Sequence, residues 1–85
     1  FNLSQNYPNP FNPRTTIRFQ LPERAMVILK VYDLLGSEVT SLLSQEIGAG
    51  DHRVEWNAAN VASGMYFYEL TSGGSRAVKK MVVLK

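Results

Sequence analysis

Apolar and polar residues alternate over most of the chain, and this pattern predicts strands. In the stretch TTIRFQL, Ile17, Phe19 and Leu21 fall on one side, and threonine, arginine and glutamine fall on the other. This is the period of two that a half-buried strand shows. The stretch AMVILKVYD repeats the pattern, with Val27 and Val31 on a shared apolar face. The pattern therefore predicts two half-buried strands in the first half of the chain.

Turn signals separate the next two strands. DLLG at residues 33–36 predicts a turn, because aspartate caps its own backbone and glycine supplies a positive φ. SEVTSLLS follows as a strand in which Val39, Ser41 and Leu43 would face inward, although the same residues also fit a short helix. After the glycine-rich turn IGAGDH, the stretch HRVEWN places Trp56 on an inner face between polar neighbours.

The last third of the chain predicts a hairpin. MYFYELT is apolar on both faces, which is typical of a central strand, and Gly73 and Gly74 form a turn into the final strand, RAVKKMVVLK. About seven short strands, spaced by ~8–12 residues, are expected in all. The fold class is therefore all-β: an immunoglobulin-like antiparallel β-sandwich in a single domain over residues 1–85.

The N-terminal segment LSQNYPNPFNP breaks the alternation. Its three prolines fix φ and remove backbone donors, so residues 1–13 are expected to form an extended strap without a regular ladder, ahead of a sandwich over residues 14–85. Tyr7 and Phe11 would anchor the strap by burying their rings against a sheet edge. Such a strap would also shield an edge strand from pairing with a neighbour.

Composition narrows the class of protein. Eighty-five residues provide one core, and the charged fraction of 19% argues against a disordered tail. The net charge of +2 is too small and too dispersed for a nucleic-acid surface. Without cysteine there is no disulfide framework, thiolate metal site or thiol nucleophile. No signal-peptide pattern begins the chain, so we expect either a cytosolic protein or a piece of a longer precursor.

No pattern predicts a catalytic, cofactor or metal site. His52 has no partners at metal-ligand or acid–base spacing, so a solvated loop histidine is expected. Trp56 with the tyrosines would suit a sugar-stacking face, but an inward tryptophan on a sandwich strand is more often core. Lys79 and Lys80 suggest either a basic patch or the usual protection of an edge strand. Enzyme activity is not expected.

Four stretches resemble one known family. These are LSQNYPNPFNP followed by TTIRFQLP, then LKVYDLLGSEV, VASGMYFYEL and the closing KKMVVLK. In this order and spacing they are similar to the type A C-terminal sorting domain of type IX secretion cargo proteins. A weaker similarity to the immunoglobulin-like domain of flagellar hook-capping proteins supports the same fold class.

The resemblance implies a non-catalytic export signal. Such a domain follows a cargo domain in the same precursor, crosses the inner membrane with the cargo's own signal peptide, and is read in the periplasm by an outer-membrane translocon. A sortase commonly removes it and joins the cargo to a surface lipopolysaccharide, whereas other cargo is released. The implied location is the periplasm in transit, and then the cell surface or the medium.

The resemblance also implies where the translocon would recognise the chain. By position these residues are Gly64, Tyr66, Lys79, Lys80, Met81, Val82, Val83, Leu84 and Lys85. A terminal strand with a free end offers an edge and a carboxylate for capture by a partner. The last residues are equally explained as a final core strand, with Gly64 serving a turn. A carbohydrate-binding or adhesion module, acting through Trp56, is the alternative function.

Overall fold

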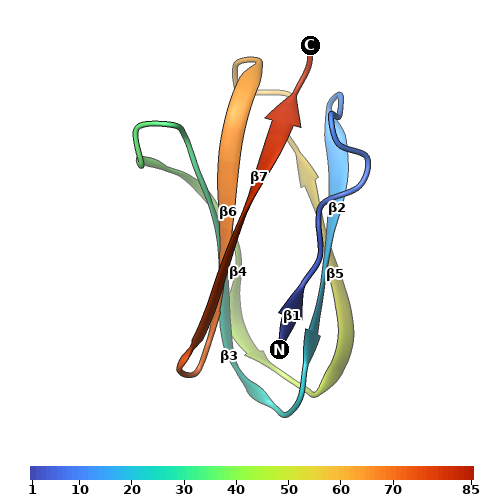
Figure 1. The fold of residues 1–85 in the computed structure, drawn as a ribbon, viewed down its shortest axis with the longest axis vertical. Helices are drawn as coiled ribbons and strands as arrows, with labels where there is room; N and C mark the ends of the chain where they lie inside the picture. Colours follow the sequence, from blue (N-terminus) through green and yellow to red (C-terminus); the bar gives the residue numbers. More distant parts are fainter.

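Seven strands form two antiparallel sheets that face each other, and the chain contains no helix (Figure 1). The computed structural model describes residues 1–85. In order, the strands are β1 (Asn2–Leu3), β2 (Arg14–Leu21), β3 (Ala25–Tyr32), β4 (Glu38–Ile47), β5 (Gly50–Asn57), β6 (Gly64–Ser72) and β7 (Ser75–Val83). No helix of the length and apolar content needed to cross a membrane is present. The predicted all-β sandwich is confirmed.

The strand order is immunoglobulin-like with one variation. One sheet has the order β1-β2-β5 and the other β4-β3-β6-β7. In an immunoglobulin constant domain the first, second, fourth and fifth strands share one sheet. Here the fourth strand pairs with the third instead, so the second sheet gains a strand. Strand β6 lies between β3 and β7, as its two apolar faces predict.

Alternation along the strands builds one core between the sheets. Ile17 and Phe19 from β2 meet Val27 and Leu29 from β3, and all four are almost fully buried. Each of these strands shows the strict in–out burial pattern that a sheet with one covered face produces. The faces predicted for β2 and β3 are therefore confirmed, and their inward residues form part of the hydrophobic core.

Strand β4 departs from its predicted face. It is a strand and not a helix, but its pairing with β3 shifts between Leu29 and Lys30. This β-bulge adds one residue, Leu42, so that Leu42 and Leu43 are both half-buried while Ser41 is exposed. The inward position expected for Ser41 is wrong, because an extra residue reverses the alternation beyond it.

His52 is not a solvated loop residue, contrary to expectation. It lies on β5 opposite Phe19, and the two rings stack with centroids 5.5 Å apart. A ring nitrogen, Nε2, lies 2.8 Å from the carbonyl oxygen of Gly48. The imidazole therefore closes the end of the sandwich core beside the β4–β5 turn.

Trp56 is a core residue, and this generates a test. Its indole is 6% exposed and packs against Phe11 at 5.8 Å and Tyr66 at 6.0 Å between ring centroids. Replacing Trp56 by alanine removes these contacts and leaves a cavity, so we expect a loss of about 3 kcal/mol or more in the free energy of unfolding. Urea unfolding measures this loss. A Trp56→Ala chain of unchanged stability would place the indole outside the core.

Candidate functional site

The strap, residues 1–13, crosses from the three-stranded sheet to the edge of the four-stranded sheet (Figure 1). The sequence predicts that it is extended and without a regular ladder, but residues 2–3 form β1 against β2 and the chain bends at residues 8–10 and 12–13. The peptide bonds before its three prolines are cis. The bends let one segment contact both sheets.

The two predicted anchors behave differently. Phe11 is 3% exposed and packs on Trp56 in the core. The ring of Tyr7 is 81% exposed, so the expectation that this ring anchors the strap is wrong. The backbone of Tyr7 holds the strap to β2 instead. Its N–H donates to the Thr16 carbonyl at 3.0 Å, and its carbonyl accepts from the Thr16 N–H at 2.9 Å.

A buried polar cluster of Asn6, Thr15 and Tyr68 fixes the middle of the strap. The Asn6 N–H donates to the Tyr68 hydroxyl at 2.8 Å, and that hydroxyl donates to the Ser4 carbonyl at 2.7 Å. The Asn6 side-chain amide donates to Thr15 Oγ1 at 2.9 Å. No buried side-chain polar atom in the chain is left without a partner. The cluster therefore joins β2, β6 and the strap at little desolvation cost.

The strap also covers the outer edge of β7. Gln5 donates to the Lys80 carbonyl at 2.6 Å, and Asn9 Oδ1 accepts from the Val82 N–H at 2.9 Å. The Phe11 N–H donates to the Val82 carbonyl at 3.1 Å, while the Phe11 carbonyl accepts from the Leu84 N–H at 3.0 Å. The edge from Lys80 to Leu84 is thus already paired, and the expectation of an edge open for capture is wrong there.

The last residues of the chain differ in where their side chains lie. Met81 and Val83 are completely buried between the sheets. Lys80 points outward from the four-stranded sheet, whereas Lys79 lies on the inner side of β7 at its margin. Two residues follow β7 and are exposed: Leu84 and Lys85.

The chain end is fastened to the loop between β5 and β6. The Lys85 N–H donates to Ser63 Oγ at 3.0 Å, and the Lys85 ammonium donates to the Ala59 carbonyl at 2.6 Å. Tyr66 reaches the same loop, because its hydroxyl donates to the Ala62 carbonyl at 2.7 Å. The Tyr66 ring is buried beside Trp56. A partner protein would therefore not contact this ring directly, and the ring could affect binding only by stabilising the fold.

Gly64 opens β6 opposite Val83 and has φ +149°. No atom would contact an added Cβ there, but the backbone conformation is one that L-residues rarely adopt. The predicted residues of β6 and of the chain end therefore lie together at one end of the sandwich, with Gly64 and Tyr66 inside its structure and Leu84 and Lys85 on its surface.

Chemistry-bearing side chains do not gather at this end or elsewhere. No group of three or more histidine, cysteine or acidic residues is arranged to hold a metal ion. Surface hollows lie beside β1, β2 and β5 and over β3, β6 and β7. What the arrangement offers is a protein surface whose shape depends on the paired chain ends.

This geometry defines a class of domain. It is a small all-β sandwich in which hydrogen bonds from the N-terminal segment hold the final strand. A search of curated proteins found no match. The model of one family, the secretion system C-terminal sorting domain, matches residues 5–84. The chain belongs to this family, and it is a C-terminal sorting signal for type IX secretion. It acts with the type IX machinery on an attached cargo, which is sent to the cell surface or secreted.

Sequence reasoning missed the polar residues that hold the strap. A signal was present for Thr15, which shares the parity of Ile17 and Phe19 and is buried with them. A buried hydroxyl needs a partner, and the nearby asparagines were the available donors. Nothing local indicated Gln5 or Asn9, because their partners lie 75 and 73 residues away.

Tyr68 tests the buried cluster by mutation. Tyr68→Phe removes the hydroxyl that accepts from Asn6 and donates to Ser4, leaving two buried backbone groups unpaired. We expect a loss of about 1–2 kcal/mol in unfolding free energy, measured by urea denaturation. The exposed Tyr7→Phe is the matched control and should change stability by less than about 0.5 kcal/mol.

The same hydroxyl predicts alkaline sensitivity. Burial raises the pKa of Tyr68 to about 12, against about 10 for an unfolded tyrosine. The folded state therefore keeps its proton where the unfolded state loses it. The stabilisation is complete below pH ~10 and is lost as the pH rises through about 12. Stability should fall across this window, and it should fall less in Tyr68→Phe; equal slopes would contradict a buried hydroxyl.

Gly64 provides a backbone test. Gly64→Ala forces an L-residue into φ +149° without a steric clash, and we expect it to cost about 1 kcal/mol or more. Gly74→Ala is the control, since Gly74 has no positive φ and also meets no atom. Thermal unfolding of both variants would measure the difference. Equal stabilities would mean that Gly64 is not conformationally required.

Proposed function

We propose that the outer-membrane translocon reads this domain as a folded unit, through the end of the sandwich where the two chain ends meet. The observation that supports this proposal is that β7 is both a core strand and the hydrogen-bonded partner of the strap. The end of β7 therefore takes its paired conformation only in the folded domain. A receptor that binds this end distinguishes a complete, folded cargo tail from a truncated one.

In this proposal the recognition residues act in two ways. Lys80, Leu84 and Lys85 are exposed and would contact the translocon directly. Five residues would act through the fold, because they are buried, line the strand or shape its start: Gly64, Tyr66, Lys79, Met81 and Val83. Val82 would act through the fold by its backbone bond to Asn9, whereas its half-buried side chain lies on the outer face of the sheet. Substitution of the second group would therefore reduce export and stability together, whereas substitution of the first would reduce export alone.

The remaining steps of the proposal concern the cargo. The precursor crosses the inner membrane, folds in the periplasm and is captured there by the translocon. A sortase then cuts ahead of the strap and links the cargo to a surface lipopolysaccharide or releases it. The domain itself contributes no catalysis, in keeping with a family that is non-catalytic in general. The carbohydrate-binding alternative required an exposed Trp56, and its indole is only 6% exposed.

Deletion of the last two residues separates recognition from folding. Leu84 and Lys85 lie beyond β7 and outside the core, whereas deletion of Lys79 to Lys85 also removes two core residues, Met81 and Val83. We expect a periplasmic reporter fused to the 85-residue chain to reach the surface of a host with a type IX system. The two-residue deletion should leave the reporter in the periplasm with the domain still folded, at a lower melting temperature because the Leu84–Phe11 bond and the two Lys85 bonds are lost.

The matched control keeps the length and changes only contacts. Lys85→Gln retains the main-chain bond to Ser63 while removing the ammonium that binds the Ala59 carbonyl, and it should retain partial export. Surface fractionation and protease accessibility of the reporter give the readout. Export of the two-residue deletion at the full-chain level would overturn the assignment of recognition to the chain end.

A further inference from the structure

The outer faces of the two sheets differ sharply in chemistry. On the three-stranded sheet, every outward-facing residue of β2 and β5 is polar, with Arg18 and Arg53 directly opposite each other. On the four-stranded sheet more than half of the outward positions of β3, β6 and β7 are apolar or aromatic, and the others are Lys30, Glu69, Thr71, Arg76 and Lys80. The apolar and aromatic residues include Ile28, Tyr32, Met65, Phe67, Val78 and Val82. An antiparallel sheet that faces only water is expected to look like the first face and not the second.

The strand register gathers these side chains into one patch. Phe67 lies opposite Tyr32 on one side and Lys80 on the other, and Met65 lies opposite Val82. A surface hollow beside Tyr32, Phe67 and Val78 is lined in part by Leu34 of the DLLG turn. The neighbouring Leu35 is 92% exposed. The turn needs only its aspartate and glycine, so the exposed leucines serve no purpose that the fold explains.

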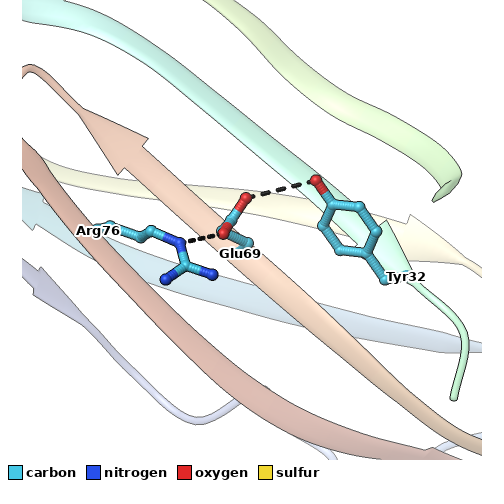
Figure 2. A network of polar contacts seen from close by, with 3 residues as sticks. All are labelled: Tyr32, Glu69 and Arg76. Atoms are coloured by element: carbon cyan, nitrogen blue, oxygen red, sulfur yellow. Dashed lines mark hydrogen bonds and ion pairs between the residues drawn. The ribbon is translucent and has the colours of Figure 1, made fainter. Parts of the chain in front are cut away.

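Most charges on this face are neutralised within the domain. Glu69 accepts hydrogen bonds from the Tyr32 hydroxyl, at 3.4 Å, and from Arg76 Nε, as Figure 2 shows. Lys30 pairs with Glu38 at 3.0 Å. The Lys80 ammonium has no carboxylate or hydrogen-bond partner. Lys80 is therefore the one cation of the patch without a partner, whereas the Asp33 carboxylate at the edge of the hollow accepts from the Leu35 and Ser37 N–H groups. An unpaired cation beside apolar side chains favours a partner with the opposite charge.

We propose that the outer face of β3, β6 and β7 is a docking surface for a protein of the export machinery that presents an apolar surface with a carboxylate opposite Lys80. The proposal rests on the function proposed above and adds a second contact to it. The N-terminal strand β1 belongs to the other sheet (Figure 1), so the point at which a cargo would join the domain is not on this face.

Size and charge argue against a second copy of this chain as the occupant. Three strands about 4.8 Å apart, over about five residues of about 3.3 Å each, give a footprint of a few hundred Å². A stable interface buries about 800 Å² on each partner. A second copy would also bring another unpaired Lys80, and the carboxylate that it offers beside the patch, Asp33, already accepts from the Leu35 and Ser37 N–H groups. A small patch of this kind suits a transient contact, which a domain passing through a translocon requires.

Export of charge-reversed and polar variants tests the docking surface. In the same reporter fusion, Lys80→Glu should reduce surface export at least tenfold, because it replaces attraction by repulsion. The double variant Val78→Thr, Met65→Thr should also reduce export, since threonine suits a strand but removes apolar contact. Arg18→Glu is the matched control: it reverses one exposed charge on the other sheet and should export normally. Thermal unfolding checks that every variant is folded.

The outcomes separate this inference from the proposed function. Failure of the unmodified fusion to reach the surface would overturn the proposed function. Normal export of the unmodified fusion together with normal export of the double threonine variant would overturn the docking surface alone. Normal export of Lys80→Glu would overturn the docking surface and would also remove Lys80 from the proposed recognition residues. Sedimentation of the purified chain at micromolar concentration supplies a further test. A dimer that dissociates on Lys80→Glu would assign the face to a second copy and contradict the proposal.

Discussion

The structure depends on the contact between the strap and the last strand. Without it, β7 would be an open edge, and the sandwich would lack the buried cluster that joins β2, β6 and residues 4–6. An 85-residue domain without disulfides has a small margin of stability, so one exposed edge beside the core is a considerable liability. Hydrogen bonds between the strap residues Gln5, Asn9 and Phe11 and the last part of β7 close this edge from Lys80 to Leu84.

This constraint links folding to sorting. The two ends of the chain, more than 70 residues apart in sequence, complete each other's hydrogen bonds. The end of β7 therefore has its final shape only when the whole domain has folded. A sorting signal built in this way reports the integrity of the tail that carries it, whereas a short linear peptide would report only its own presence.

The strands could be predicted because period-two alternation is a local property of the sequence. Ile17, Phe19 and Trp56 were placed correctly for this reason. The bulge at Leu42 could not be predicted, because it depends on the register of β4 with β3. Because their rings are large, both Tyr7 and Phe11 were predicted to anchor the strap by burial. Only the ring of Phe11 is buried. Tyr7 is held by its backbone, and the long-range side-chain bonds of the strap have no local signature.

Site-resolved amide hydrogen exchange tests the central claim most directly, since it reports each backbone bond on the edge of β7. The Val82 and Leu84 N–H groups donate to Asn9 and Phe11, whereas the Val78 N–H points to the same side without a partner. The account predicts strong protection at Val82 and Leu84 and rapid exchange at Val78. Exchange at Val82 and Leu84 as rapid as at Val78 would contradict a strap that closes the edge.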